Sequence, residues 1–248
     1  MAARQAHAPV TVRYGTSSTQ TVDLFVPSGV SRPPLLVFFH GGYWQELTKQ
    51  DSAFAAPQCL ANGIAYAAVD YTLAPQATLD DIVAECRAAV AWLARSGETV
   101  GVDPHRIVVA GSSAGAHLAA MTALSAGDAV KGTVLVSGIY DLAPLIGTSI
   151  DEALRLDPAS AARNSPAGQE LSDFPLSLVC WGEIETDAFK QQSQAFARRL
   201  RDAGVDCTDF EIAGRNHFDV ILDLAEAATP LGRSVFTLIQ RMSGPLQD

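Results

Sequence analysis

The sequence predicts an α/β fold, with a mostly parallel central sheet and helices on both of its faces. Short apolar runs typical of buried strands alternate along the chain with stretches of helical spacing, which is the pattern of such sheets. The length of 248 residues and the hydrophobic content of 48% suit one large domain, so residues 1–248 are expected to form a single domain. Several of the runs are followed directly by serine, histidine or glycine, and open sheets of this kind bind ligands at that edge.

The expected strands differ in how much of their surface they bury. Residues 35–40 and 64–69 are continuous apolar runs, typical of strands covered on both faces. Residues 21–27 alternate in polarity and end at a proline, which also indicates a strand. The remaining strands are expected at residues 107–110, 134–136, 176–181 and 207–212, with an edge strand near 10–14.

Helical signals lie between these runs. Residues 78–97 open with Thr78 as a cap and with acidic residues in the first turn, and their apolar positions then recur at helical spacing. Other helices are expected near residues 52–61, 116–121, 187–203 and 231–242.

Residues 142–173 interrupt the alternation of strands and helices. They carry no strand signal, contain Pro144, Pro158 and Pro166, and include a short helical patch near 151–156. We expect this segment to be a small cap insertion lying over the strand ends.

Charge and hydropathy exclude several classes of partner. A net charge of −10 and a pI of about 4.9 argue against nucleic acid or an anionic membrane surface as the partner. No apolar run approaches the roughly 18 residues of a membrane span, and the first nine residues have no apolar segment typical of a signal peptide. The expected partner is therefore a small-molecule substrate, and the sequence leaves a homodimer open.

The four cysteines indicate a reducing compartment. Cys59, Cys86, Cys180 and Cys207 form no C-x-x-C pair and lie in apolar or helical settings. We expect them to be reduced and mostly buried, which favours the cytoplasm.

The most informative stretch is Gly111-Ser112-Ser113-Ala114-Gly115, which fits G-x-S-x-G between a strand and a helix. In that context the motif is typical of a nucleophile elbow, a turn so tight that the residues beside the serine must be small. Ser113 is therefore the candidate nucleophile. The backbone N–H of Ala114, at the start of the helix, is expected to stabilise a developing oxyanion.

A serine nucleophile needs a base, and in this fold the base follows the acid along the chain. Of the five histidines only His117 and His217 come after Ser113. His117 lies within the helix that follows the elbow and is expected to pack or hydrogen-bond there. His217 follows the last expected strand, where a loop reaches back to the serine, and is the candidate base.

The acid is expected after the strand at residues 176–181, where Glu183, Glu185 and Asp187 are available. Glu183 is close to the strand end, and Asp187 is well placed to cap the next helix. Glu185 is favoured because it lies on the loop itself, with Asp187 as the alternative acid.

A second set of oxyanion donors is expected after the strand at residues 35–40. His40-Gly41-Gly42 resembles the HGGG-type element, in which glycines let the backbone approach the substrate. The candidate donors are the N–H groups of Gly42 and Tyr43, with Gly41 as a further one.

Aromatic side chains near these groups are candidates for the substrate pocket. Tyr43 and Trp44 follow the glycines, Tyr140 precedes the cap segment, and Phe218 follows the candidate base. The alternative interpretation of these rings is ordinary packing at a loop edge.

These motifs together resemble the α/β-hydrolase type of kynurenine formamidase (arylformamidase), within the HGG-containing, hormone-sensitive-lipase-like esterases. They occur in the family's order over about residues 20–240 and read His40-Gly41-Gly42-Tyr43-Trp44-Gln45, Asp70-Tyr71-Thr72-Leu73-Ala74-Pro75, Gly111-Ser112-Ser113-Ala114-Gly115-Ala116-His117-Leu118, Ser137-Gly138-Ile139-Tyr140-Asp141-Leu142 and Asn216-His217-Phe218-Asp219. Aligning Phe189 and Gln192-Ser193 with the family places its acid, usually Asp, on Glu185. This departure in residue type leaves Asp187 as an alternative.

The resemblance implies an α/β-hydrolase fold and a serine hydrolase of tryptophan catabolism. The reaction is hydrolysis of N-formyl-L-kynurenine to L-kynurenine and formate through a formyl-enzyme, with no metal or organic cofactor. The alternative is a carboxylesterase acting on short-chain acyl esters, for which the same groups would serve. A non-catalytic binding protein of the same fold is disfavoured because Ser113 and His217 are both present.

Overall fold

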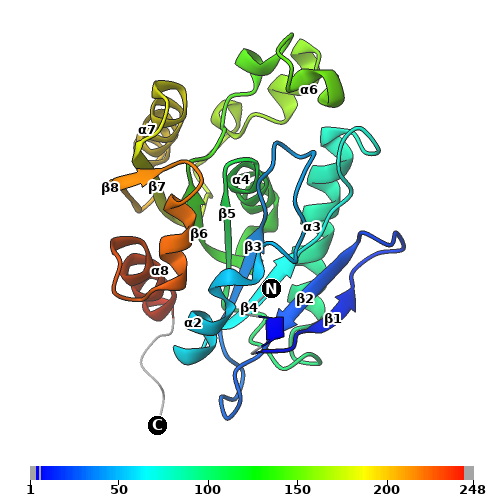
Figure 1. Cartoon of the computed structure of the whole chain (residues 1–248), viewed down its shortest axis with the longest axis vertical. Helices are drawn as coiled ribbons and strands as arrows, with labels where there is room; N and C mark the ends of the chain where they lie inside the picture. The colour runs from blue at the N-terminus through cyan, green and yellow to red at the C-terminus, as the bar shows by residue number, and fades with distance from the viewer. Residues whose placement is uncertain (1–3, 6, 243–248) are drawn as a thin grey trace.

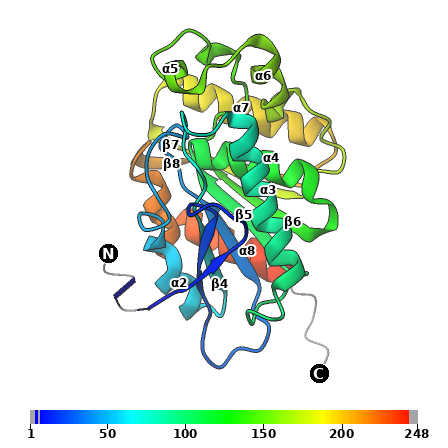
Figure 2. The same ribbon diagram turned by 90° about the vertical axis from the view of Figure 1, so that its right-hand side faces the viewer.

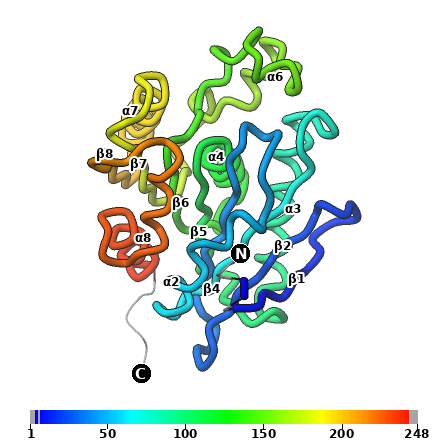
Figure 3. The backbone as a smooth tube through the Cα atoms, in the orientation of Figure 1, coloured from blue at the N-terminus to red at the C-terminus, as the bar shows by residue number. Residues whose placement is uncertain are grey.

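In the computed structural model, which describes residues 4–5 and 7–242, the strands form one eight-stranded sheet in the order β1-β2-β4-β3-β5-β6-β7-β8. β1 and β2 pair antiparallel, as do β2 and β4, and every other neighbouring pair is parallel. The antiparallel pair lies at one edge and β8 at the other (Figure 3). The strands are β1 Val10–Arg13, β2 Thr21–Phe25, β3 Leu35–Phe39, β4 Ala65–Val69, β5 Ile107–Ser112, β6 Val130–Val136, β7 Leu176–Ile184 and β8 Cys207–Asn216.

Helices cover both faces of this sheet, as the alternation of elements predicts (Figure 1). The α-helices of the described residues are α2 Ala56–Ala61, α3 Leu79–Ser96, α4 Ala114–Ala126, α5 Asp151–Leu154, α6 Pro158–Arg163, α7 Asp187–Asp202 and α8 Pro230–Arg241, of which α5 and α6 lie beyond the sheet (Figure 2). No helix among the described residues is both long enough and apolar enough to cross a membrane.

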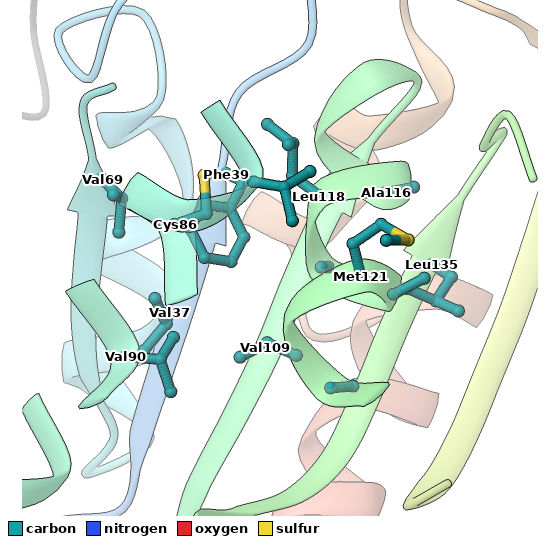
Figure 4. Close-up of a cluster of buried hydrophobic side chains, with 14 of the residues drawn as sticks. Val37, Phe39, Val69, Cys86, Val90, Val109, Ala116, Leu118, Met121 and Leu135 are labelled. Atoms are coloured by element: carbon teal, nitrogen blue, oxygen red, sulfur yellow. The ribbon is translucent and has the colours of Figure 1, made fainter. Parts of the chain in front are cut away.

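The side chains of β3 show how the sheet divides the core into two layers. Val37 and Phe39 belong to the cluster that includes residues of α3, α4 and α7, whereas Leu36 and Phe38 belong to the cluster with α2 and α8. Successive side chains of a strand point to opposite faces, so a continuous apolar run fills both layers. Figure 4 shows the first layer, where Val37 lies beside Val90 of α3 and the side chains of Leu118 and Met121 come from α4.

Strands β7 and β8 are longer than the apolar runs predict. β7 continues to Ile184 and β8 to Asn216, and these two residues are paired in register after an irregularity beyond Gly182. Backbone pairing therefore extends past the hydrophobic residues. Glu185 and His217 consequently follow the ends of two neighbouring strands.

The segment at residues 142–173 lies beyond the end of β6, at the top of the molecule in Figure 2. It contains no strand, and α5 coincides with the expected helical patch. Helix α6 is an addition to the prediction. Its start has a clear cause, because the carboxylate of Asp157 accepts the N–H of Ser160 and Pro158 occupies the first turn.

A charged cluster is buried beneath the antiparallel edge. Asp23 on β2 is fully buried, forms an ion pair with Arg4, and lies 3.6 Å from Nζ of Lys49 through Oδ1. Lys49 Nζ is also 3.8 Å from Asp70 Oδ2. Buried charges of this kind persist only when they are paired.

The four cysteines are unpaired, as expected, with Cys59, Cys86 and Cys180 buried and Cys207 partly exposed. The edge strand expected near residues 10–14 is β1. Positions 1–3 and 6, before this strand, lie outside the described residues.

Candidate active site

Ser113 occupies the strained turn between β5 and α4. Its φ of 57° and ψ of −122° place it in a region that non-glycine residues rarely adopt. The motif glycines explain why the chain turns here: a Cβ on Gly111 would lie 2.2 Å from the carbonyl carbon of Gly115, and one on Gly115 would lie 2.0 Å from the carbonyl oxygen of Phe39. The requirement for small residues is therefore steric, set by backbone packed against backbone.

His217 is held beside Ser113 by a short turn after β8. Asn216 donates its backbone and side-chain N–H groups to the carboxylate of Asp219, and its own side-chain oxygen accepts the N–H of Phe218. The imidazole Nε2 lies 3.1 Å from Ser113 Oγ, although 104 residues separate them in sequence. The turn after β8 thus brings His217 to Ser113, as the order of serine, acid and histidine along the chain predicts.

Glu185 lies on the other side of the imidazole. Its Oε2 is 3.0 Å from His217 Nδ1, while its Oε1 accepts the backbone N–H of Gly182 and the hydroxyl of Ser137. A carboxylate only accepts, so Nδ1 carries the proton and Nε2 faces Ser113 as an acceptor. Burial alone would raise the pKa of Glu185, but hydrogen bonds from these three groups outweigh it, and the pKa is lowered.

The structure does not bring the two other carboxylates to His217. Asp187 is exposed as the first residue of α7, where its charge favours the helix N-terminus, and Thr186 occupies the N-cap position. Glu183 accepts the backbone N–H of Gly214 at 2.8 Å. Of the candidate acids, Glu185 alone contacts the imidazole.

The glycine loop after β3 lies directly against the elbow. A Cβ on Gly41 would be 2.9 Å from the carbonyl oxygen of Ser112 and 3.4 Å from Ser113 Cβ. Among the described residues, no protein acceptor receives the backbone N–H groups of Gly41, Gly42, Tyr43 or Ala114. Donors that are free beside a nucleophile are what an oxyanion hole requires.

Comparison with known proteins agrees with this geometry. Residues 36–220 match the family model described as alpha/beta hydrolase fold. Kynurenine formamidase of Danio rerio is 33% identical over 228 residues, which cover 87% of this chain and 76% of the relative, and that of Salmo salar is 32% identical, covering 89% and 78%. The chain belongs to the α/β-hydrolase family, in the group of kynurenine formamidases.

A solved structure supports the same fold. The esterase of the archaeon Pyrobaculum calidifontis is 26% identical, with a TM-score of 0.77 over 90% of this chain and 81% of the other. This member of the formamidase group is thus a hydrolase whose architecture resembles that of an esterase.

Two aromatic residues expected in the substrate pocket of this α/β-hydrolase do not line it, which corrects the prediction. Trp44 is fully buried, and its indole N–H is directed at His117 inside the protein. Tyr140 is also fully buried and stacks on Phe196 of α7, with ring centroids 4.2 Å apart. Both rings are apolar core, which is the alternative that the sequence left open.

The remaining aromatic candidates keep accessible surface. Tyr43 is partly exposed beside the glycine loop, and Phe218 is 85% exposed with its ring edge-on to His217 at 5.6 Å. An exposed ring of this size next to the candidate base is available for a substrate. The role of Tyr43 and Phe218 in substrate binding stays a prediction.

Phe189 is a site residue that the sequence reasoning used only for alignment. Its ring lies 4.0 Å from the imidazole of His217, tilted by 36°. Its position in the first turn of α7, directly after the loop that carries Glu185, is the signal that could have identified it. Because the two rings are in contact, Phe189 restricts the motion of the imidazole.

A metal would need a cluster of ligands. Within residues 4–5 and 7–242 no group of three or more His, Cys, Asp or Glu side chains is placed to hold one.

Proposed function

We propose that the chain hydrolyses N-formyl-L-kynurenine to L-kynurenine and formate, with Ser113, His217 and Glu185 as its catalytic triad. The observation that carries the proposal is the continuous line of hydrogen bonds from Glu185 through His217 to Ser113, beside free N–H groups. Membership of the kynurenine formamidase group supports the choice of substrate.

In the first half of the reaction Ser113 Oγ attacks the formyl carbon while His217 Nε2 takes its proton. Glu185 stabilises the imidazolium that forms and keeps its Nδ1–H in place. The N–H groups of Ala114, Gly42 and Tyr43 hold the oxyanion, with Gly41 as a further donor. The C–N bond then breaks as His217 returns the proton to the aryl amine, which leaves as kynurenine.

In the second half a water molecule attacks the formyl ester on Ser113. His217 takes a proton from the water and returns it to Ser113 Oγ, and formate leaves. A formyl group is the smallest acyl group, so selectivity is expected on the leaving-group side, where Tyr43 and Phe218 are accessible.

The test is a comparison of kcat/KM for N-formyl-L-kynurenine and p-nitrophenyl acetate, with Ser113→Ala as the control. We expect a preference for the formamide in the wild-type protein and loss of turnover of both substrates in Ser113→Ala. A large preference for the ester would refute the formamidase proposal. Unchanged turnover in Ser113→Ala would refute the whole mechanism.

The second candidate function is a carboxylesterase acting on short acyl esters. The likeness to the Pyrobaculum calidifontis esterase favours it, because the same serine chemistry cleaves esters and formamides.

The proposed activity, hydrolysis of N-formyl-L-kynurenine, belongs to tryptophan catabolism. The cytoplasmic location and a homodimer remain predictions from the sequence.

A further inference from the structure

A buried chain of hydrogen bonds joins the glycine loop to the cap segment through His117. The indole N–H of Trp44 donates to His117 Nδ1 at 3.2 Å, and His117 Nε2 lies 2.6 Å from the carbonyl oxygen of Asn164. Trp44 and His117 are fully buried and Asn164 is nearly so. The side chain of Asn164 in turn donates to Asp80 at the start of α3, so the chain is anchored at its far end.

The partners determine the protonation of His117. An indole N–H is only a donor and a backbone carbonyl is only an acceptor, so His117 carries its proton on Nε2 and presents a bare Nδ1. A second proton on the ring, at Nδ1, would point an N–H group at the indole N–H of Trp44, so two donors would face each other. Burial also favours the neutral ring and lowers the pKa of His117 to about 4.

Trp44 ends a turn whose backbone is strained. Gly42 has a φ of 90°, which glycine tolerates, but Tyr43 and Trp44 follow with φ of 48° and 62°, in the left-handed region that non-glycine residues rarely occupy. Such residues persist where tertiary contacts over-determine them. Here the contacts are the indole bond to His117 and the N–H of Ala74, which donates to the carbonyl of Trp44 at 2.9 Å.

His117 is also attached to the nucleophile. It lies one turn into α4, and its backbone N–H donates to the carbonyl oxygen of Ser113 at 3.2 Å. One residue therefore bonds the elbow through its backbone and the glycine loop through its side chain. The rings of Trp44 and His117 meet edge to face, with centroids 5.0 Å apart, so the contact is directional.

We propose that His117 is a positioning residue, which through Trp44 holds the turn of Gly42, Tyr43 and Trp44 so that its N–H groups face the oxyanion formed at Ser113. The inference rests on the proposed function, since it concerns the same oxyanion. An oxyanion is bound only in the transition state, so a shifted turn lowers kcat and leaves KM nearly unchanged.

Two substitutions of His117 separate its two hydrogen bonds. The amide of glutamine reaches the position of Nε2, so His117→Gln keeps a donor for Asn164 and loses the acceptor for Trp44. The shorter amide of asparagine lies near Nδ1, so His117→Asn keeps an acceptor for the indole and loses the bond to Asn164. Trp44→Phe removes the indole donor from the other side.

We expect kcat to fall about tenfold in His117→Gln and in Trp44→Phe, less than the loss on deleting an oxyanion donor outright. The double variant should lose about as much as either single variant, because both remove the same bond. His117→Asn should lose less than His117→Gln. Thr122→Val is the matched control on α4, since Thr122 is buried and its hydroxyl has no partner among the described residues.

The variants are compared as kcat and KM well below their melting temperatures, on N-formyl-L-kynurenine and on p-nitrophenyl acetate. Lowered melting temperatures with wild-type kcat would mean that His117 is only structural and would overturn the inference, as would additive losses in the double variant. If wild type hydrolyses only the ester, the formamidase proposal fails and the comparison is still decided on the ester. If wild type hydrolyses neither substrate, the triad proposal fails and the His117 inference fails with it.

Discussion

Replacing Glu185 with glutamine removes one negative charge behind His217 and leaves the side chain almost the same size. In the structure Oε1 accepts two donors, the N–H of Gly182 and the hydroxyl of Ser137, whereas Oε2 accepts only His217 Nδ1. The single oxygen of the amide will stay where two donors converge. The amide NH2 then faces His217.

That arrangement selects the wrong tautomer of the imidazole. Facing an N–H donor, Nδ1 of His217 must become the acceptor, so the ring proton moves to Nε2 and points at Ser113 Oγ, 3.1 Å away. The imidazole can then no longer take the serine proton. In triads of this kind the same change lowers kcat about 10⁴-fold, which corresponds to about 5 kcal/mol in the activation free energy.

The assay is the steady-state formation of kynurenine from N-formyl-L-kynurenine, with Asp187→Asn as the matched control. Asp187 is exposed on α7, so its variant should stay within about twofold of wild type. KM should change little in Glu185→Gln, because the acid does not contact the substrate. A loss of less than about tenfold in Glu185→Gln, or an equal loss in Asp187→Asn, would refute the assignment of Glu185.

Further predictions concern stability, measured by urea denaturation. Gly115→Ala should destabilise by more than about 3 kcal/mol, because the new methyl group would overlap the backbone of Phe39 and His40, whereas Gly168→Ala, with open space around it, should stay within about 0.5 kcal/mol. Asp23→Ala should cost about 3–5 kcal/mol because it removes a buried partner of Lys49; a loss below about 1 kcal/mol would contradict this. His117 has a pKa of about 4 when folded, against 6.5 as its ordinary value, so the unfolded chain binds more protons between these pH values. Its contribution is complete above pH 6.5 and decreases as the pH falls toward 4, by up to about 3 kcal/mol, and His117→Gln should weaken this dependence between pH 7 and pH 4.5.

The elbow was predictable because its causes are local. A buried apolar run, two glycines and a small residue after Ser113 determine a tight turn, and a Cβ on Gly111 would meet the backbone of Gly115 and Ala116 within that turn. The order of serine, acid and histidine then limited the choice of base to His217, which lies 3.1 Å from the serine.

Which of the three carboxylates faces His217 does not depend on local sequence alone. Glu183, Glu185 and Asp187 lie within five residues of each other, and which one faces His217 depends on where β7 ends. That end is set by pairing with β8, in which Ile184 lies opposite Asn216. Sequence spacing favoured Glu185, but it contained no information on the neighbouring strand.

The direction of the aromatic side chains was predicted least well. Trp44 and Tyr140 stand beside motif residues in sequence, yet both rings point into the core. His117 shows the same limit, since its bonds to Trp44 and Asn164 join residues 73 and 47 positions away. A residue type and its neighbours in sequence do not tell which face of a loop is covered.

By itself the sequence determined the alternation of strands and helices, the elbow at Ser113, the candidate base that lies beside it and the glycine loop, because each depends on residue type, spacing or chain order. Only the tertiary structure decided which carboxylate meets His217, which aromatic rings remain accessible and what holds the turn at Trp44. These depend on contacts between segments far apart in the chain, and such contacts arise only when the sheet brings the segments together.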